Sequence, residues 1–161
     1  MKATNYPAGY EVKATESYNI FEKVNDYRNS KWWENLPEGV TFSNFRDQLN
    51  EDWERAVDGI LPLVGRGCTI CYYSDRRAAT ITKVEFTKKG EPKAIEVMHN
   101  EVRCKDYYAG DYEVLPELCE HMGVDRFTRR RNGRWIMEGH ESRDGVQLML
   151  HYQSHYIDPS F

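Results

Sequence analysis

Four arginines and a tryptophan surround a tight turn in the second half of the chain, and they form its densest group of side chains suited to binding: Arg129, Arg130, Arg131, Arg134 and Trp135. The turn residues Asn132-Gly133 are the strongest signal for a two-residue type I′ hairpin, in which both turn residues need positive φ. In such a hairpin Arg131 faces Arg134 and Arg130 faces Trp135, so cations and an aromatic ring share one face. These groups suit phosphates, nucleic-acid bases or acidic patches on a protein.

Like charges that lie directly opposite each other on paired strands destabilise a hairpin, so the facing arginines need compensation. An external anionic partner is one source of compensation. Acids within the chain, such as Glu138 and Glu141, are the other, and they would make the hairpin an ordinary solvated face. The sequence leaves both interpretations open.

A second polar group, Tyr73-Ser74-Asp75-Arg76, lies between two segments that are rich in strand-forming residues. Tyr73, Asp75 and Arg76 offer a hydroxyl, a carboxylate and a guanidinium at the end of a strand, where loops often bind ligands. Ser and Asp also favour turns by hydrogen bonding to nearby backbone amides, and an adjacent Arg readily pairs with the Asp. The group therefore predicts either a structural turn or a second binding surface.

The four cysteines, Cys68, Cys71, Cys104 and Cys119, do not form a zinc signature. Cys68 and Cys71 are spaced as a CxxC pair, but the second close pair that a zinc ribbon requires is missing. The pair also lies in a segment typical of a strand, where positions three apart face opposite sides. We expect small buried thiols, with no metal and no cofactor.

The sequence lacks the motifs of the common enzyme classes, since it contains no phosphate loop, nucleotide-binding fingerprint, zinc-protease helix or nucleophile elbow. His151 and His155 are four residues apart, as in helical metal sites, but their segment is typical of a strand followed by a tail. A small hydrolase or nuclease that uses Asp75 with His99 or His121 is the catalytic alternative, and no spacing supports it. We expect a protein that is not an enzyme.

Helical periodicity dominates the first part of the chain. Apolar residues recur every three or four positions over residues 17–30 and, more clearly, over residues 45–60. Thr41 or Ser43 is a suitable N-cap for the second of these helices. Glycines and prolines then end the helical pattern and mark a boundary near residue 65.

Beyond this boundary the pattern alternates, which predicts short strands separated by turns. Residues 113–121 are the exception, since they are expected to form one or two helical turns. The order of the elements favours an α+β fold, in which N-terminal helices precede a small antiparallel β-sheet or an SH3-like barrel. The expected strands are residues 68–73, 78–86, 93–99, 127–131, 134–138 and 146–153.

The balance of basic and acidic residues changes at the same boundary. Residues 1–64 carry 7 basic and 11 acidic groups and are expected to form an acidic helical region, whereas residues 65–161, the expected β domain, carry 15 of each. The net charge of −4 excludes the positive charge over the whole protein that is typical of many nucleic-acid-binding proteins. No apolar run approaches the roughly 18–20 residues that span a bilayer, and no signal peptide is evident. We expect a cytoplasmic protein without membrane contacts.

Three runs of residues in the second part of the chain carry a resemblance. The first is Tyr73-Ser74-Asp75-Arg76 followed by Ala79-Thr80-Ile81 and Val84, the second is Phe127-Thr128-Arg129 with Asn132-Gly133-Arg134-Trp135, and the third is Tyr156-Ile157-Asp158-Pro159-Ser160-Phe161. With these runs in this order, residues 68–161, about 60% of the chain, resemble a group of small uncharacterised proteins encoded by bacteriophages and prophages.

The resemblance implies a phage accessory protein that acts in the cytoplasm of the bacterial host. Small phage proteins of this kind often occupy a host protein, as inhibitors of bacterial defence systems such as anti-CRISPR proteins do. The resemblance carries over no catalytic or binding residue. We expect a host protein as the partner, bound through the arginine hairpin and through Tyr73, Asp75 and Arg76. A nucleic-acid-binding module that uses the same hairpin is the alternative.

Overall fold

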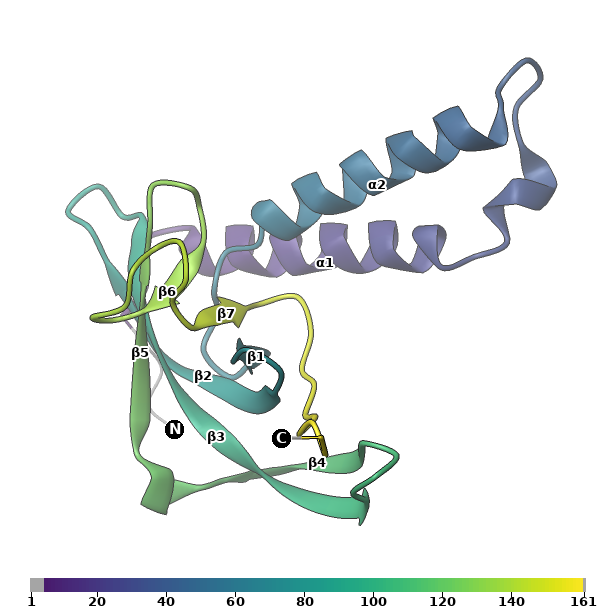
Figure 1. Cartoon of the computed structure of the whole chain (residues 1–161). Coiled ribbons are helices and arrows are strands. Elements are labelled where there is room, and N and C mark those ends of the chain that lie inside the picture. The colour runs from purple at the N-terminus through teal and green to yellow at the C-terminus, as the bar shows by residue number, and fades with distance from the viewer. Residues whose placement is uncertain (1–4, 161) are drawn as a thin grey trace.

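The computed structural model describes residues 5–160 and begins with a helical hairpin that projects from the rest of the molecule (Figure 1). This hairpin, the helical arm, consists of α1 (Tyr10–Arg28), the short 3₁₀ helix η1 (Trp32–Asn35) and α2 (Phe42–Asp58). Thr41 is the N-cap of α2, because its hydroxyl accepts a hydrogen bond from the backbone N of Asn44 at 3.2 Å. The clearer of the two expected helices is therefore confirmed together with its cap.

The first helix begins at Tyr10 and not at residue 17, so the expected start was wrong. Tyr10 and Ala14 continue the buried stripe formed by Tyr18 and Phe21 toward the N-terminus. The hydroxyl of Tyr10 donates a hydrogen bond to the carbonyl oxygen of Pro62 at 2.6 Å. The first turn of α1 shows little hydrophobic periodicity in the sequence. This contact with a distant segment of the chain stabilises it.

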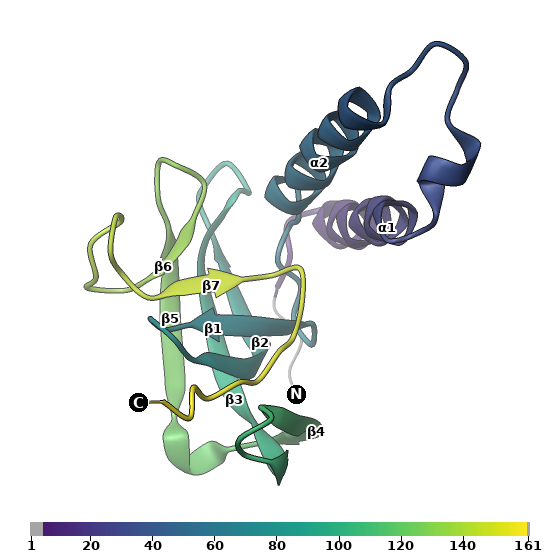
Figure 2. The ribbon, with the colours of Figure 1, turned by 45° about the vertical axis from the view of Figure 1, so that its right-hand side comes forward.

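Seven antiparallel strands follow the arm, and six of them close into a barrel (Figure 2). The strand order is β2-β1-β7-β6-β5-β3, and the pairing of β2 with β3 joins the two ends of this series, while β4 extends the sheet beyond β3. The α+β fold with a small antiparallel barrel is therefore confirmed. The strands are β1 (Gly67–Cys71), β2 (Arg76–Phe86), β3 (Pro92–Asp106), β4 (Asp111–Leu118), β5 (Val124–Arg129), β6 (Trp135–Met137) and β7 (Gln147–Met149).

The strand β4 occupies a segment for which the sequence predicts helical turns. Residues 113–121 fall mostly within β4, and only η2 (Glu120–Met122) adds one 3₁₀ turn. β3 explains this error, because it continues past the barrel to Asp106 and places Val102 opposite Val114. Hydrogen bonds to a neighbouring strand outweigh a weak local preference.

The barrel and the base of the arm share one hydrophobic core. Phe127 and Ile81 are fully buried, and they belong to the same cluster as Phe21 of α1. Above the barrel, the rings of Phe21 and Trp53 lie 5.6 Å and 5.3 Å from the ring of His151. These contacts orient the base of the arm, and the division into two domains near residue 65 stays a prediction.

Beyond β7, the chain is held mainly by side chains. The expected strand over residues 146–153 shortens to Gln147–Met149. The buried Thr69 of β1 holds the segment that follows, since its hydroxyl donates to the carbonyl oxygen of Tyr152 at 2.8 Å and accepts from the backbone N of Ser154 at 2.9 Å. One side chain thereby replaces the strand pairing that the alternating pattern predicts.

The substitution Thr69→Val is expected to lower the free energy of unfolding by about 1–3 kcal/mol, because two partly buried backbone groups lose their hydrogen-bond partner. Chemical denaturation measures this change. Thr15→Val, at an exposed position on α1, is the matched control and should change the stability by less than about 0.5 kcal/mol. A loss at Thr69 as small as that of the control would show that its hydroxyl does not hold the C-terminal segment.

Candidate binding site at one end of the barrel

The arginine hairpin has a three-residue loop, and the expected two-residue type I′ turn was wrong. Gly133 has a φ of 82°, but no non-glycine residue among residues 5–160 has a positive φ, so Asn132 cannot supply the second one. The backbone N of Gly133 donates to the carbonyl oxygen of Arg130 at 2.9 Å, and the backbone N of Arg130 donates to the carbonyl oxygen of Arg134 at 2.9 Å. Arg129 therefore lies opposite Trp135, and Arg130 lies opposite Arg134.

This register turns Arg130 inward. Its Nε donates to Oγ1 of Thr128 at 3.0 Å, one Nη donates to Oγ of Ser142 at 3.1 Å, and the other donates to the carbonyl oxygen of Met137 at 3.3 Å. The side chain of Arg130 thus connects β5 to the loop between β6 and β7. Of the four predicted arginines, Arg130 has a structural role, and the other three are exposed.

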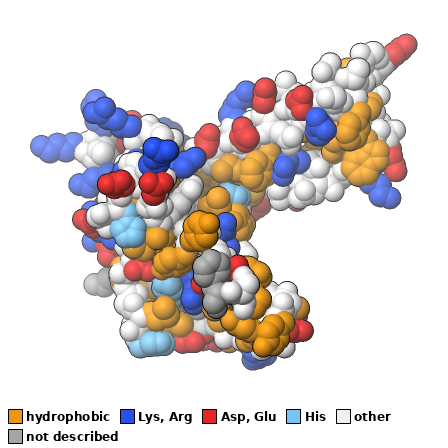
Figure 3. All heavy atoms as spheres, in the orientation of Figure 1, with side chains coloured by type: hydrophobic (Ala, Val, Ile, Leu, Met, Phe, Trp, Pro, Cys, Tyr) orange, Lys and Arg blue, Asp and Glu red, His pale blue; other side chains and the backbone are white. Residues whose placement is uncertain are grey.

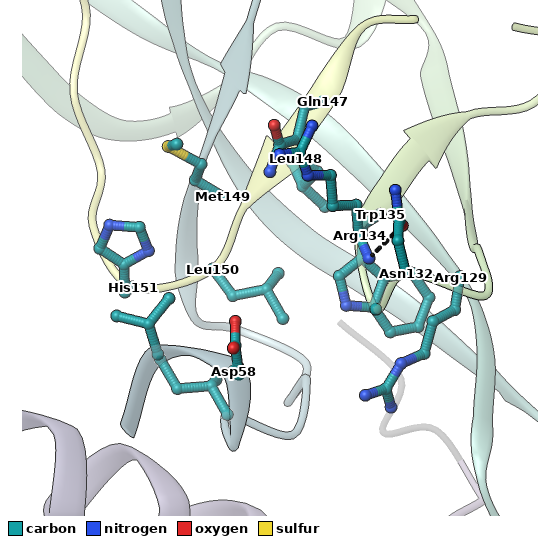
Figure 4. A pocket seen from close by; sticks show the side chains of 13 residues that line it. Asp58, Arg129, Asn132, Arg134, Trp135, Gln147, Leu148, Met149, Leu150 and His151 are labelled. Carbon is teal, nitrogen blue, oxygen red and sulfur yellow. Dashed lines mark hydrogen bonds between the residues drawn. The ribbon is translucent and has the colours of Figure 1, made fainter. Parts of the chain in front are cut away.

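A cleft of about 330 Å³ opens between this hairpin, β7 and the C-terminal end of α2 (Figure 4). Arg129 and Arg134 line it together with Trp135, whose ring is 5.8 Å from Cζ of Arg129 and is only 6% exposed. Asp58 and His151 line it from α2 and from the segment after β7. The sequence gives no sign that these two residues lie beside the hairpin, because only the packing of the arm on the barrel brings them there.

The histidine of this cleft is uncharged at neutral pH. Burial lowers the pKa of His151 below its usual range, so its ring adds no positive charge near pH 7. Asp58 is exposed at the end of α2 and contributes the carboxylate that lines the cleft. The cleft therefore offers two guanidinium groups, one carboxylate and an apolar wall, which suits a partner that is mainly acidic.

Lysines of a neighbouring turn enlarge the cationic surface. Ala94 of β3 lies opposite Thr128 of β5, so the turn between β2 and β3 is at the same end of the barrel as the arginine hairpin (Figures 1 and 2). Basic side chains gather at this end in the space-filling view (Figure 3). We call this surface the basic rim, and its six exposed residues are Lys88, Lys89, Lys93, Arg129, Arg131 and Arg134.

Internal acids do not neutralise the basic rim. Glu138, one of the two acids expected to compensate the hairpin, accepts from Nε of Arg126 at 2.8 Å, and Glu85 pairs with the same arginine. Glu141 is exposed and pairs with none of the rim residues. Within residues 5–160, no carboxylate lies within 4.0 Å of a cationic group of the rim. This arrangement favours the interpretation in which an external anionic partner compensates the charges.

The second predicted group lies at the opposite end of β2 from the rim, and the C-terminal segment engages it. Oδ1 of Asp75 accepts from the backbone N of Asp158 at 2.9 Å, and Arg76 pairs with Tyr156 through two backbone hydrogen bonds. The guanidinium of Arg76 donates to the carbonyl oxygens of Tyr72 and Asp75. These contacts favour the structural turn over a second binding surface.

Two of the three runs that carry the resemblance therefore touch each other. The loop that contains Asp75 holds the chain end that contains Asp158. Tyr73 of this loop is 95% exposed. Phe161, the last residue of the third run, lies outside the described residues. A binding role for Tyr73, Asp75 and Arg76 stays a prediction.

The catalytic alternative gains no support from the geometry. Nε2 of His99 lies 2.9 Å from Oδ2 of Asp125, so the buried His99 is paired with a carboxylate other than that of Asp75. His121 is exposed on η2. In the part of the chain that the structure describes, no group of three or more His, Cys, Asp or Glu side chains could hold a metal ion.

The cysteines are free thiols on separate parts of the fold. Burial raises the pKa of Cys68 and of Cys71, so both thiols stay protonated near neutral pH. Cys119 is also buried, and Cys104 is exposed on β3. The CxxC pair lies within β1, from its second residue to its last, as the strand pattern predicts.

None of the described helices has the length and apolar character needed to cross a membrane. No family model matches the chain, and neither a search of curated proteins nor a search of solved structures finds a similar protein.

Arg130→Gln is expected to lower the free energy of unfolding by about 1–3 kcal/mol, because three hydrogen bonds from a charged donor are lost. Arg131→Gln, one position along the same loop, should change it by less than about 0.5 kcal/mol. Chemical denaturation of the two variants tests the register of the hairpin. Equal effects on stability would contradict the inward position of Arg130.

Proposed function

We propose that this is a phage accessory protein that acts without catalysis, by binding a protein of the bacterial host through its basic rim. It acts in the host cytoplasm. The sequence resemblance supports the phage origin, and it also suggests the form of the function, which is inhibition of a bacterial defence system in the manner of anti-CRISPR proteins. The basic rim supports the binding itself.

One observation carries the proposal: six exposed cations share one end of the barrel, and none forms an ion pair within residues 5–160. The whole chain has a net charge of −4, so this concentration of positive charge is local. Like charges repel one another, and a nearby counter-charge offsets this repulsion. An acidic surface on another protein supplies that counter-charge, and it also accelerates the encounter of the two molecules.

The geometry favours a protein over a nucleic acid as the partner. Binding of single strands commonly uses exposed aromatic rings on which bases stack. Trp135, the aromatic residue of the hairpin, is only 6% exposed, so its ring offers no such face. Nucleic-acid binding remains the second candidate, because the exposed guanidinium groups of Arg131 and Arg134 suit phosphates as well as carboxylates.

The test is affinity capture of the tagged protein from bacterial lysate, with and without nuclease. We expect one stoichiometric host protein that survives nuclease treatment. The variant Arg131→Glu/Arg134→Glu should weaken its capture about tenfold or more, since both substitutions place a carboxylate against an acidic partner. The melting temperature of this variant should stay nearly unchanged, because both side chains are exposed.

The matched control is Lys13→Glu/Lys105→Glu, which makes the same change in net charge at exposed positions of α1 and β3 outside the basic rim. It should retain the captured protein. Capture of nucleic acid that disappears with nuclease or with added salt would support the second candidate instead. Equal retention by the two double variants would show that the basic rim is not the binding site.

A further inference from the structure

The two sides of the helical arm differ in how completely they are covered. On the side that faces His151, polar contacts close the seam between α1 and α2: Nε1 of Trp53 donates to Oδ1 of Asn25 at 3.1 Å, and Nε of Arg28 donates to Oδ1 of Asn50 at 3.1 Å. The guanidinium of Arg28 also lies 4.6 Å from the ring of Trp53. This side of the arm is complete within one chain.

The other side of the seam is an open apolar groove. Two hollows of about 380 Å³ and 340 Å³ share Val24 and Asp52, so they form one groove along the two helices. Ile20 is 57% exposed and Tyr27 is 49% exposed, although both lie on the apolar stripe of α1 that lines the groove. Its apolar lining consists of Ile20, Val24 and Tyr27 from α1 and Phe45, Leu49 and Ala56 from α2.

Opposite charges border the groove on its two sides. Lys23 lies on the α1 side and Asp52 on the α2 side, and both line the same hollow. Asp52 has only neighbours on its own helix, since it accepts from Nε2 of Gln48 at 3.0 Å and lies 3.7 Å from Nη1 of Arg55. Lys23 is exposed and forms no ion pair with the described residues. Arg55 lines the other hollow on the α2 side and lies near Asp52 of its own helix. In the hollow that Lys23 and Asp52 share, the cation is on one border and the anion on the other, so this part of the groove is complementary to itself.

We propose that a second copy of this chain docks groove to groove and completes a four-helix bundle. A two-fold axis that runs along the groove places α1 of each copy over α2 of the other, in antiparallel orientation. Lys23 of each copy then faces Asp52 of its partner, so the contact forms twice. Every helix in the resulting bundle is antiparallel to its neighbours, which is the arrangement typical of up-down bundles.

The dimensions of the arm fit this assembly. The helices have 19 and 17 residues, so they span about 25–29 Å. The apolar lining of the groove runs from Ile20 to Tyr27 on α1 and from Phe45 to Ala56 on α2. The ring contacts of His151 with the arm lie on the opposite side of the seam, so they leave the groove open. The proposal does not rest on the function of the basic rim, which lies on the barrel.

Analytical ultracentrifugation of the full chain over a concentration series tests the dimer. We expect a concentration-dependent shift from the 19.0 kDa monomer to twice that mass. Ile20→Asp should raise the dissociation constant about tenfold or more, because it places a charge in the apolar interface. Val12→Asp is the matched control, since Val12 is 63% exposed on the same helix but does not line the groove, and it should leave the constant unchanged.

The charge contact has a sharper test. Lys23→Glu alone and Asp52→Lys alone should each weaken self-association about tenfold, because each reverses two symmetry-related contacts. An equal mixture of the two variants should form a heterodimer, in which Glu faces Lys at one contact and Lys faces Asp at the other. An effect within one chain cannot produce this recovery on mixing.

A chain that stays monomeric up to its solubility limit would overturn the proposal. A dimer that Ile20→Asp and both charge variants leave unchanged would overturn it as well, because the copies would then meet elsewhere. Circular dichroism of each variant establishes that the helices are intact, so a loss of association reports on the interface.

Discussion

The strand β3 hydrogen-bonds along both of its edges, and the rest of the structure depends on this double pairing. β2 covers one edge, and β5 and then β4 cover the other. The pairing with β2 closes the barrel, so the central strands have no free edge through which chains could associate. The pairing of β3 with β5 places the β2–β3 turn next to the arginine hairpin, and this proximity forms the basic rim.

At the opposite end of the barrel, the start of β2 contacts the C-terminal segment of the chain. The loop before β2 leads to a bridge with the C-terminal segment, where Arg76 pairs with Tyr156 and Asp75 receives the backbone of Asp158. Residues that resemble a ligand site in the sequence therefore hold the end of the chain.

The arm and the rim present two different kinds of surface. The rim is charged and exposed, so it suits fast encounter with an acidic partner that depends on salt. The groove of the arm is apolar with a charge on each border, so the burial of Ile20 and Tyr27 would supply most of its binding energy and the charges would set the orientation. In a dimer with the proposed two-fold axis, both barrels lie at the same end of the bundle, which brings two basic rims into one assembly.

Local patterns in the sequence determined the elements whose stability is mainly local. The apolar stripe and the N-cap Thr41 define α2, alternation defines most of the barrel strands, and Asn132-Gly133 marks the position of the hairpin. Tertiary structure alone decided the features whose partners are far apart in the chain. Arg130 reaches Ser142 in the next loop, β4 forms because β3 is available as its pairing partner, and His99 of β3 pairs with Asp125 of the neighbouring β5. Periodicity reports which face of an element is apolar, but register and pairing depend on hydrogen bonds between segments that only the folded chain brings together.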